Sequence, residues 1–578
     1  MGATLLSHRD LRFLLYEWLN VEELTKNPRF QDHSRETFDA VLDLSADLAE
    51  REFRSHNRKS DLNEPRFDGH TVTTIPEIAQ ALTAFAGSGL LAAPLDETLG
   101  GIQLPHVIHQ ACFAWFQAAN IATCAYPMLT MANANLLLAY GTDEQISTYV
   151  RPMVDGRFFG TMCLSEPQAG SSLADVETRA VPDGTGRYRI FGHKMWISGG
   201  DHELSENIVH LVLARARGAR PGVKGLSLFL VPKHLGDERN DVALAGLNHK
   251  MGYRGAVNTL LNFGEGVHSP HGAPGAIGYL VGEENRGLEY MFHMMNEARI
   301  GVGAGAAALG YTGYLEALEY ARTRPQGRPA GAKNPSTPQV PIVEHADVRR
   351  MLLACKAYAE GSLALVLYAA KLVDEGNAML LDVLTPIVKS WPSQWCLVAN
   401  DLAIQIHGGA GYTRDHNVEQ FYRDNRLNPI HEGTHGVQAL DLLGRKVIQD
   451  DGAGFAVLTR TIRETIDRAP AELKPWATAL AARVDRLAQV TQLLRQDGHA
   501  ERVLANASLY LEAAGHIVLA WIWLDQAVAA HGHAGPFYEG KLAAARYFFT
   551  YELPTVDSKL DLLADRDTQL LDLDTTCL

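Results

Sequence analysis

Five consecutive residues, His431-Glu432-Gly433-Thr434-His435, have the side chains best suited to chemistry. They match H-E-x-x-H, the zinc-protease motif, in which two histidines one helical turn apart bind the metal and the glutamate activates a water. That interpretation requires a continuous helix. Asn428-Pro429 stands just before the motif and Gly433 lies inside it, so a helix that places both imidazoles on one face is poorly supported. The alternative makes Glu432 a carboxylate base on a tight turn, without a metal.

The composition is that of a large globular protein with an acidic surface. The 578 residues are 46% hydrophobic and 21% charged, which is enough for several domains with their own cores. A net charge of -15 and a pI near 5.8 argue against nucleic acid as the main partner. The six cysteines include no CxxC pair, so neither a zinc knuckle nor a disulfide framework is indicated, and they fit a reducing compartment.

No segment reads as a targeting signal or a membrane span. Residues Met1 to Asp10 lack a basic region followed by an apolar run and a cleavage site. The most apolar later stretch, Ile517 to Ala530, is short and contains Asp525, which favours a buried helix. We therefore expect a cytoplasmic protein without stable membrane insertion.

Hydrophobic periodicity divides the chain into four predicted domains: helical residues 1–160, a β domain at 161–285, a helical bundle with the catalytic base at 286–451 and a further helical domain at 452–578. Strands are expected at Tyr188–Phe191, Ile208–Ala214, Leu226–Val231 and Val257–Phe263. Long helices are expected at Phe38–Phe53, Val107–Ala119, Arg349–Val373 and Gln394–His407, the last stopped by Gly408-Gly409. A loop is expected at Gln326–Pro341.

Strands confined to the middle of the chain predict a mostly helical α+β fold in place of alternating βαβ units. The β domain is expected to be barrel-like, and the bundle to have four helices. The run Gly301-Val302-Gly303-Ala304-Gly305-Ala306 satisfies G-x-G-x-x-A, but it lies in a helical stretch and no strand leads into it. Close helix packing is the better interpretation of these small residues.

Two segments of the β domain resemble the acyl-CoA dehydrogenase family. Cys163-Leu164-Ser165-Glu166-Pro167-Gln168-Ala169-Gly170-Ser171 is similar to the family's C-x-[ST]-E-P-x-A-G-S segment. Lys194-Met195-Trp196-Ile197-Ser198-Gly199-Gly200 is similar to its K-x-W-I-[ST]-N-G strand, with Gly199 in place of the usual Asn. The resemblance implies flavin contacts from Cys163, Leu164, Ser165, Ser171, Trp196 and Ser198, with Ser171 also touching the substrate.

The helical half continues the resemblance, which extends from about residue 90 to 450. Gln405-Ile406-His407-Gly408-Gly409-Ala410-Gly411-Tyr412 is similar to the family's Q-x-x-G-G-x-G-[YF] run, which implies that Gln405, Gly408 and Gly409 contact FAD. Glu432 stands twenty-three residues after Gly409, a separation typical of the family, whose glutamate here is the α-proton base. The resemblance adds Thr434 as a cofactor contact and Gly433 as a substrate contact.

Further substrate and cofactor residues follow from the same resemblance. Arg299 and Asn296 match residues beside the substrate channel. A minority of relatives have their base immediately before this arginine, where this chain has Ala298, so Glu432 is the expected base. Arg324 is a candidate FAD contact, because its segment is similar to the family's R-x-x-F-G stretch. In this chain the segment is one residue shorter and has no Phe. His431 replaces the usual Tyr, and the sequence leaves open whether it binds substrate, tunes the base or is structural.

Elementary chemistry agrees with a flavin-dependent desaturase. Removing hydrogen from two unactivated carbons needs a cofactor that accepts hydride, because no side chain does so. A thioester acidifies the α-hydrogen, particularly if a donor such as the Glu432 backbone N–H holds the developing enolate oxygen. A carboxylate with a reference pKa of about 4.3 must then gain basicity by exclusion of water.

The resemblance therefore implies FAD-dependent α,β-desaturation of acyl-CoA, with medium to long straight chains expected and electron-transferring flavoprotein as acceptor. The extended start and the tail resemble a larger bacterial subgroup that includes 3-methylthiopropanoyl-CoA dehydrogenases. The alternative substrate is therefore 3-methylthiopropanoyl-CoA or another short or aryl acyl-CoA. The tail also leads us to expect a homodimer. Two other functions remain: a zinc hydrolase using His431, Glu432 and His435, and a flavin enzyme of this fold with a changed reaction, such as an oxidase.

Overall fold

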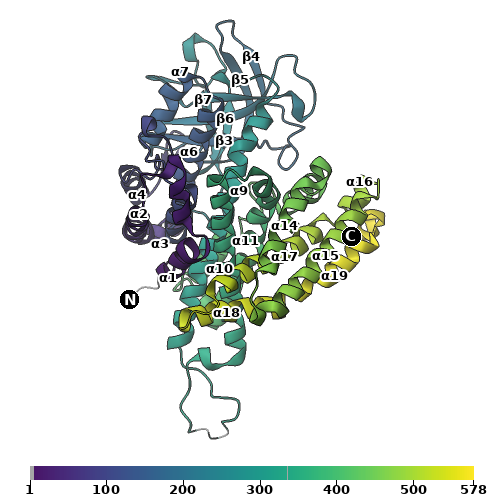
Figure 1. Cartoon of the computed structure of the whole chain (residues 1–578). Helices are drawn as coiled ribbons and strands as arrows, with labels where there is room; N and C mark the ends of the chain where they lie inside the picture. Colours follow the sequence, from purple (N-terminus) through teal and green to yellow (C-terminus); the bar gives the residue numbers. More distant parts are fainter. Residues whose placement is uncertain (1–4, 333, 335) are drawn as a thin grey trace. The chain divides into compact units, whose positions relative to one another are not determined.

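A computed structural model of the chain describes residues 5–332, 334 and 336–578 (Figure 1). These residues form two compact units. Unit 2 contains Glu36–Leu104 and Ala119–Gly301, and unit 1 contains the residues up to Arg35, Pro105–Ala118 and Val302–Leu578. The mostly helical α+β fold predicted from the sequence is confirmed, with the large sheet confined to the middle of the chain.

Unit 2 is built from helices and one large sheet. The Asn120 side chain caps the start of helix α6: its oxygen accepts a hydrogen bond from the Thr123 N–H at 3.1 Å. This satisfies one of the first-turn backbone N–H groups that have no partner within the helix. The helix predicted at Phe38–Phe53 is present as α2, which continues as a π-helix at Ala49–Arg54. The helices of this unit are α2 (Arg35–Leu48), α3 (Ser55–Leu62), α4 (Pro76–Gly87), α6 (Ile121–Tyr140), α7 (Asp143–Gln145) and α8 (Arg151–Val154).

The sheet has eight strands in the order β10-β11-β5-β12-β7-β6-β3, and β4 pairs with both β5 and β6. All four strands expected from the sequence are present. Their bounds are β3 (Phe158–Cys163), β4 (Arg179–Pro182), β5 (Tyr188–Ser198), β6 (Asn207–Ala216), β7 (Leu226–Pro232), β10 (Val242–Leu247), β11 (Asn258–Phe263) and β12 (Ala276–Val281). Two small hairpins complete the unit: β1 (Arg66–Phe67) with β2 (Val72–Thr73), and β8 (His234–Leu235) with β9 (Glu238–Arg239).

Successive side chains of β6 enter different hydrophobic clusters, as the period of two in a strand requires. Leu211 and Leu213 lie in the cluster that also contains residues of α6. Val212 and Ala214 lie in the cluster that contains residues of β5 and β11. Strand β6 pairs in parallel with β3 and antiparallel with β7, and its side chains are buried on both faces. This buried sheet positions the segment that follows β3.

Unit 1 contains the helical bundle and a further helical domain. Its bundle is formed by the end of α9 (Gly287–Thr323), α10 (Ala346–Asp374), α11 (Ala378–His407), α12 (Val418–Asn425) and α13 (His435–Asp441), with α1 (His8–Arg12) and α5 (His106–Ala119). The four expected long helices are confirmed, although α11 starts sixteen residues earlier than predicted and contains Pro386 and Pro392. Gly408, with a φ of 60°, ends α11, and Gln326–Pro341 contains no helix or strand among its described residues.

Small residues allow α9 to lie close to α11. A Cβ on Gly303 would stand 2.1 Å from the Val388 carbonyl oxygen, and one on Gly310 would stand 2.6 Å from the Cys396 Cβ. Neither distance is sterically possible, so glycine is required at both positions. Close helix packing is therefore confirmed as the role of the G-x-G-x-x-A run within this helix.

The further helical domain surrounds α17, which lies among α14, α15 and α19 in Figure 1. Its helices are α14 (Ala453–Asp467), α15 (Lys474–Arg495), α16 (Ala500–Leu504), α17 (Ala507–Ala530), α18 (Pro536–Tyr547), α19 (Val556–Asp565) and α20 (Gln569–Asp572). Lys541 on α18 is 1% exposed and forms ion pairs with Asp10 and Glu360. This buried charge cluster joins the domain to α1 and α10 within unit 1.

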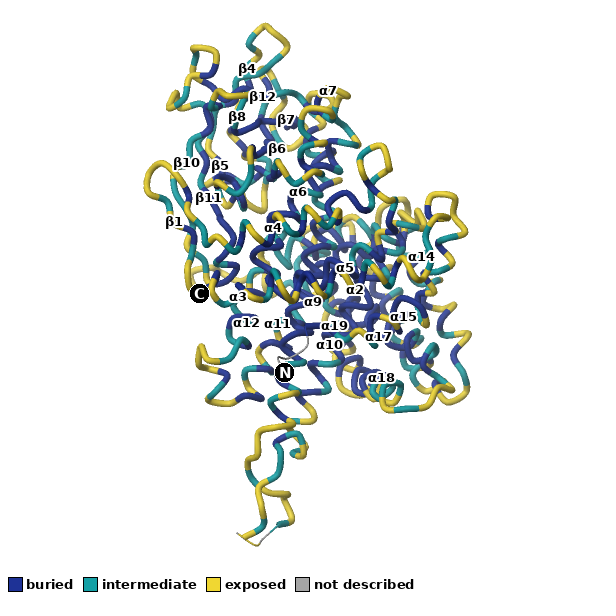
Figure 2. Tube along the Cα trace, turned by 90° about the vertical axis from the view of Figure 1, so that its left-hand side faces the viewer, coloured by how far each residue is buried: buried dark blue, intermediate teal, exposed yellow. Residues whose placement is uncertain are grey.

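Three helices are long and apolar enough to cross a membrane by length and composition: α6, α10 and α17. In each of them, 78% to 83% of the most apolar window is buried inside the protein. Figure 2 shows the same burial as dark blue along α17. The segment Ile517–Ala530 is therefore part of a core helix, as the sequence predicts.

Candidate active site

Glu432 lies on a tight turn between α12 and α13, and the residues 427–434 are not helical. Glu432 has a φ of 53°, in the left-handed region that side chains with a Cβ rarely adopt, and Gly433 follows with a φ of 88°. Such a conformation costs about 1–3 kcal/mol and persists only where the surroundings hold it. The turn is therefore a strained segment with a carboxylate at its centre, as found at functional sites.

Two buried side chains hold the carbonyl groups of this turn. The Lys389 ammonium on α11 donates to the carbonyl oxygens of Asn428 and Gly433, both at 2.7 Å, and Lys389 is 0% exposed. The Gln438 amide on α13 donates to the carbonyl oxygens of Glu432 at 3.1 Å and Gly433 at 3.4 Å. Three carbonyl groups before, at and after the carboxylate are thus fixed by side chains from two helices.

A chain of buried amides connects His431 to the bundle. The His431 Nε2 lies 3.0 Å from Asn428 Oδ1, and Asn428 Nδ2 donates to Asn425 Oδ1 at 2.9 Å. Asn425 Nδ2 in turn donates to Asn400 Oδ1 at 2.7 Å, and Asn400 Nδ2 donates to the Leu309 carbonyl of α9 at 2.9 Å. Burial, and then the positive charge of Lys389, lower the pKa of His431 to about 3. The imidazole is therefore neutral at physiological pH.

His435 connects the turn to the further helical domain. Its Nδ1 contacts the Ser390 hydroxyl of α11, and its Nε2 lies 3.8 Å from Glu512 Oε1 of α17. Burial lowers the pKa of His435, although the charge of Glu512 acts in the opposite direction. Helix α13, which begins at His435, also packs against α17. The domain at the end of the chain therefore contacts the segment that follows the base.

The geometry does not support the zinc interpretation of H-E-x-x-H. His431 lies on the turn and His435 is the first residue of α13, so the two imidazoles are not on one face of one helix. Their ring nitrogens contact Asn428 and Ser390, respectively. Among residues 5–332, 334 and 336–578, no group of three or more His, Cys, Asp or Glu could hold a metal ion.

In unit 2, a buried ion pair joins the two segments predicted to contact flavin. Lys194 on β5 donates to the Leu164 carbonyl at 3.0 Å and to Glu166 Oε1 at 2.8 Å. The Met195 N–H donates to the Ser165 carbonyl at 3.0 Å. Burial acts to raise the pKa of Glu166, but the charge of Lys194 and the hydrogen bonds from Lys194, Thr178 and the Glu177 N–H together lower it. The segment after β3 therefore lies directly beside β5.

Trp196 is the side chain in this region that best fits a bound aromatic ring system. It is 58% exposed and has a φ of 65°, an unusual combination for a large aromatic residue in a strand. An apolar face presented to solvent on strained backbone fits the planar ring of a flavin. Ser198 accepts a hydrogen bond from Asn258 Nδ2 at 3.1 Å, and Ser171 is exposed.

Cys163 faces away from solvent, which limits how it could contact a cofactor. Its side chain is 0% exposed, within the sheet's core cluster, and burial raises the pKa of its thiol to about 12. A flavin contact at this position would therefore use the backbone. The neighbouring Leu164 is 9% exposed and Ser165 is half-buried, so the segment becomes more accessible as it leaves β3.

The predicted substrate residues of unit 2 lie on the first part of α9. Arg299 is 3% exposed, and its Nη1 lies 3.5 Å from Asn296 Oδ1. Ala298 between them is buried and has no group that could act as a base. Glu297 receives two hydrogen bonds from Asn135 Nδ2, at 2.9 and 3.0 Å, and burial raises its pKa. Sequence analysis did not identify this carboxyl group.

The predicted FAD contacts of unit 1 gather at one end of the bundle. Tyr320, one turn before Arg324, stacks on His407 with ring centroids 4.2 Å apart, which brings the end of α9 beside the end of α11. Gln405, Gly408 and Gly409 are exposed there, and a Cβ on either glycine would meet nothing within 4 Å. Arg324 Nη1 donates to the Pro325 carbonyl at 3.0 Å. This strip is open enough for an extended ligand.

Thr434 has a structural role at the start of α13. Its hydroxyl accepts a hydrogen bond from the Val437 N–H at 3.3 Å as the N-cap of that helix. A cofactor contact at Thr434 would have to share this hydroxyl oxygen, which has a second lone pair.

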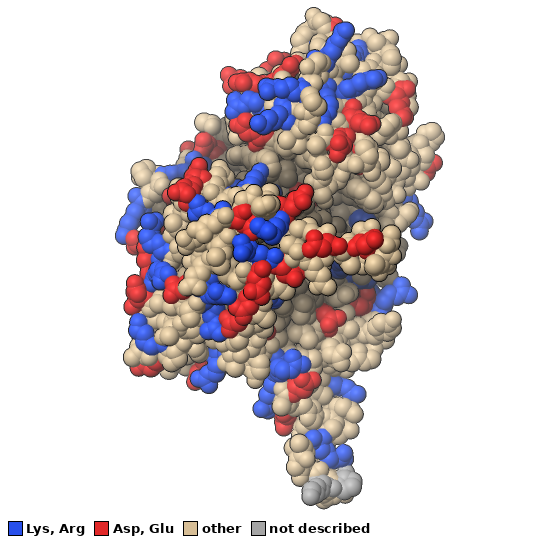
Figure 3. All heavy atoms as spheres, turned by 90° about the vertical axis from the view of Figure 1, so that its right-hand side faces the viewer, with Lys and Arg blue, Asp and Glu red and all other residues tan. Residues whose placement is uncertain are grey.

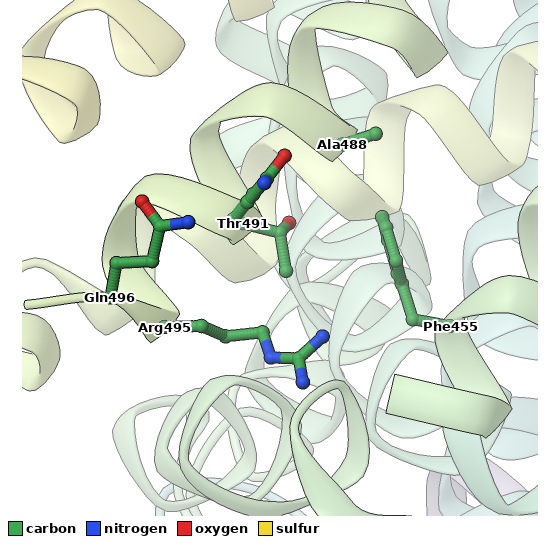
Figure 4. Close-up of a pocket in the computed structure, with 6 residues that line it drawn as sticks. Phe455, Ala488, Thr491, Arg495 and Gln496 are labelled. Carbon is green, nitrogen blue, oxygen red and sulfur yellow. The ribbon is translucent and has the colours of Figure 1, made fainter. Parts of the chain in front are cut away.

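One pocket lies apart from all of these residues. It has a volume of about 460 Å³ and is lined by Phe455, Ala488, Thr491, Gln492, Arg495 and Gln496 of α14 and α15 (Figure 4). None of these residues belongs to a segment predicted to bind flavin or substrate. Arg495 pairs with Asp451 at 2.6 Å, so its charge is already compensated.

On the face of the molecule shown in Figure 3, acidic and basic side chains are interspersed. This face therefore lacks the concentrated basic surface that nucleic-acid binding requires.

Sequence analysis missed the two side chains that hold the base turn, Lys389 and Gln438. A signal for Lys389 was available: it is the single charged residue between Pro386 and Pro392 in a strongly apolar stretch of α11. A buried ammonium requires hydrogen-bond or charge partners, so a lysine in such an apolar stretch indicates a specific contact. Nothing in the sequence indicated that its partners would be the carbonyls of Asn428 and Gly433.

Comparison with known proteins identifies four consecutive matches to family models. Residues 35–157, 161–265 and 285–447 match the N-terminal, middle and C-terminal domains of acyl-CoA dehydrogenases. Residues 458–574 match a domain described as "Acetyl-CoA dehydrogenase C-terminal like". Together these matches cover both helical parts, the β domain and the further helical domain.

Two relatives are similar over most of their length. The chain is 37% identical to 3-methylmercaptopropionyl-CoA dehydrogenase of Ruegeria pomeroyi, over 82% of this chain and 83% of that protein. It is 34% identical to broad-specificity linear acyl-CoA dehydrogenase FadE5 of Mycobacterium tuberculosis, over 98% of both chains. Both relatives are acyl-CoA dehydrogenases with different named substrates.

Solved structures show the same fold. The chain resembles Caenorhabditis elegans ACDH-11 in complex with C11-CoA, with a TM-score of 0.78 at 19% identity over 98% of this chain and 94% of that one. It also resembles a Bacillus anthracis acyl-CoA dehydrogenase complexed with FAD, with a TM-score of 0.73 at 19% identity over 94% and 90%. Acyl-CoA dehydrogenases are flavin-dependent oxidoreductases that act on CH–CH bonds and use FAD, as predicted. From its domain matches and these relatives, the chain belongs to the acyl-CoA dehydrogenase family.

Proposed function

We propose that this acyl-CoA dehydrogenase, which is of the FadE5 or 3-methylmercaptopropionyl-CoA dehydrogenase type, forms trans-2-enoyl-CoA with Glu432 as the base that removes the α-proton. The observation that supports this role most strongly is the strained turn of Glu432, whose carbonyl groups are held by Lys389 and Gln438. Such over-determined geometry is typical of a group that must be aimed at a reacting atom.

The residues of the turn supply the acid–base part of the reaction. Glu432 takes the α-proton onto its carboxylate, and its own backbone N–H is the donor that we assign to the thioester carbonyl, which gains negative charge as the proton leaves. His431 stays neutral next to it, because burial and Lys389 hold its pKa near 3, and so it adds no competing positive charge. Gly433 and His431 complete the substrate contacts proposed for this turn.

Residues of unit 2 would bind FAD, which accepts the β-hydrogen as hydride. Trp196 offers the exposed aromatic face for the ring system, and Leu164 and Ser165 offer backbone groups beside it. The exposed residues Gln405, Gly408 and Gly409 of unit 1 would contact FAD across a subunit interface, as does the family segment that they resemble. Arg299 and Asn296 would contact the acyl-CoA.

For the acyl group, we favour straight medium to long chains. The FadE5 relative, 34% identical over 98% of both chains, is named as broad-specificity for linear acyl-CoA, which supports straight chains. The relative at 37% identity is named for 3-methylmercaptopropionyl-CoA, which makes that thioether the specific alternative. The two substrates differ in chain length and in the sulfur atom, so a comparison of both separates them.

Electron-transferring flavoprotein is the proposed electron acceptor, and a homodimer in the cytoplasm is the proposed state, without stable membrane insertion. A relative at 27% identity, named as a caffeyl-CoA reductase-Etf complex subunit from Acetobacterium woodii, supports the acceptor. Sedimentation of the purified protein as a stable tetramer would contradict the dimer. Rapid oxygen consumption during turnover would contradict the acceptor and indicate an oxidase.

The function is tested by anaerobic titration of the FAD-loaded protein. Saturated acyl-CoAs of increasing length, 3-methylthiopropanoyl-CoA and an aryl-propanoyl-CoA are added separately, and flavin absorbance and the enoyl-CoA product are measured. Bleaching that is fastest for medium to long chains supports the proposal. Bleaching confined to the thioether substrate selects the alternative, and no bleaching by any acyl-CoA contradicts desaturation.

A further inference from the structure

Lys389 is unusual among the lysines of unit 1 because its ammonium is buried against peptide carbonyls on either side of the proposed base. Its Nζ lies 2.7 Å from the Asn428 oxygen, four residues before Glu432, and 2.7 Å from the Gly433 oxygen, one residue after it. Charge-assisted hydrogen bonds of this length are about twice as strong as neutral ones. One cation therefore spans the turn that contains the carboxylate.

The backbone of Lys389 is itself fixed. Helix α9 passes so close that a Cβ on Gly303 would lie 2.1 Å from the Val388 oxygen and 3.6 Å from the Lys389 Cα. The next residue, Ser390, contacts the His435 ring at the start of α13. Lys389 cannot shift along α11 without disturbing both contacts, so the position of its ammonium is set by the bundle.

We propose that Lys389 is a positioning residue for Glu432: its ammonium holds the turn in the left-handed conformation that aims the base. The proposal rests on the function proposed for Glu432. It assigns to a side chain outside the known motifs the fixed direction that a proton-abstracting carboxylate needs.

The charge of Lys389 reaches the residues that flank the base. After burial, it is the next cause of the lowered pKa of His431, and it also contributes to the lowered pKa of His435. His435 also lies 3.8 Å from Glu512 of α17, so charged side chains of α11 and α17 both lie next to the turn.

The test compares three variants of the FAD-loaded protein. Lys389→Met removes the charge and all donors, and Lys389→Gln keeps amide donors without the charge. The matched control is Lys446→Met. Lys446 lies after the turn in the chain, is 12% exposed and forms an ion pair with Asp382, whereas Lys389 donates to carbonyl groups of the turn. Anaerobic flavin reduction is followed over a range of acyl-CoA concentrations, so that the maximal rate and the half-saturating concentration are both obtained.

In Lys389→Met, the maximal reduction rate should fall about 10- to 100-fold while the half-saturating acyl-CoA concentration changes less than about threefold, because positioning of the base acts on the chemical step. Lys389→Gln should regain part of the rate, because its amide can still donate to a carbonyl of the turn. A wild-type reduction rate in Lys389→Met, or equal losses in Lys446→Met, would overturn the proposal.

Amide exchange tests the turn without turnover. Exchange of residues 428–438 should be faster in Lys389→Met than in Lys446→Met, and equal exchange would overturn the proposal. If no acyl-CoA reduces the wild-type protein, the proposed function fails instead, and the exchange measurement still decides whether Lys389 holds the turn. If Lys389→Met does not fold, both measurements are made on Lys389→Gln, which should still reduce more slowly and exchange faster than Lys446→Met.

Discussion

Replacing Gly433 by alanine adds one methyl group where the turn leaves no room for it. With a φ of 88°, Gly433 adopts a conformation that costs an L-residue about 1–2 kcal/mol. The new Cβ would stand 2.5 Å from Gln438 Nε2, so this buried amide must move. Its hydrogen bonds to the carbonyls of Glu432 and Gly433 are then lost.

The magnitude follows from these two effects. Each of the two lost hydrogen bonds contributes about 0.5–1.5 kcal/mol, so with the backbone strain the native turn is destabilised by about 2–5 kcal/mol. At about 1.4 kcal/mol per factor of ten, local opening becomes about 30- to 4000-fold more frequent. Flavin reduction should also slow more than about tenfold, because the base is no longer held in place.

Hydrogen exchange of residues 428–438 measures this opening, since the His435 N–H donates to the Pro429 carbonyl at 3.1 Å in the closed turn. The matched control is Gly436→Ala, three residues away in α13, where a Cβ would meet only Thr434 Oγ1 at 4.0 Å. Alanine there should leave exchange unchanged or slow it, because alanine favours helices by up to about 1 kcal/mol over glycine. Equal exchange in the two variants would contradict the prediction that a side chain at position 433 opens the turn.

Three other perturbations have defined outcomes. Glu166→Gln leaves the Lys194 ammonium buried without its counter-charge, so urea unfolding should show a loss of about 3–5 kcal/mol; a loss under about 1 kcal/mol would contradict an essential pair. Trp196→Ala should weaken FAD affinity at least about tenfold without lowering apoprotein stability, because the indole is 58% exposed and its backbone is strained; unchanged affinity in an FAD titration would contradict the assigned role. The pKa of His431 is lowered to about 3 in the folded protein, so the unfolded chain binds more protons between that pKa and about 6.5, and stability falls as pH falls through this window. Between about pH 7 and about pH 5, the free energy of unfolding of His431→Gln should fall less than that of the wild type. Denaturant unfolding measures both, and an equal fall in the two proteins would contradict a neutral His431 imidazole in the folded state.

The sequence allowed the fold class and the four strands to be predicted, because hydrophobic period changes from helical to alternating within the chain. It also identified Glu432 on a turn, since Pro429 and Gly433 are poor helix formers. The early start of α11 was missed because Pro386 and Pro392 read as helix breaks, although the helix continues through both. Here the buried packing of the bundle outweighs the local cost of proline.

The supports of the base could not be read from one sequence. Lys389 and Asn428 are 39 residues apart, and only the folded bundle brings the ammonium to that carbonyl. The same holds for Lys194 and Leu164, which are joined through the sheet. Motif spacing identifies groups that act on a ligand, whereas the residues that hold them depend on long-range packing.

Single-turnover flavin reduction in the wild type and in Glu432→Gln measures whether Glu432 removes the α-proton. The amide preserves shape and hydrogen bonding but cannot accept the proton, so the FAD-loaded variant should bind acyl-CoA while its reduction rate falls by at least about a thousandfold. Glu432→Asp should regain part of that rate. A Glu432→Gln protein that contains FAD and is reduced at a rate within about tenfold of wild type would contradict the account, because the proton would then have another acceptor.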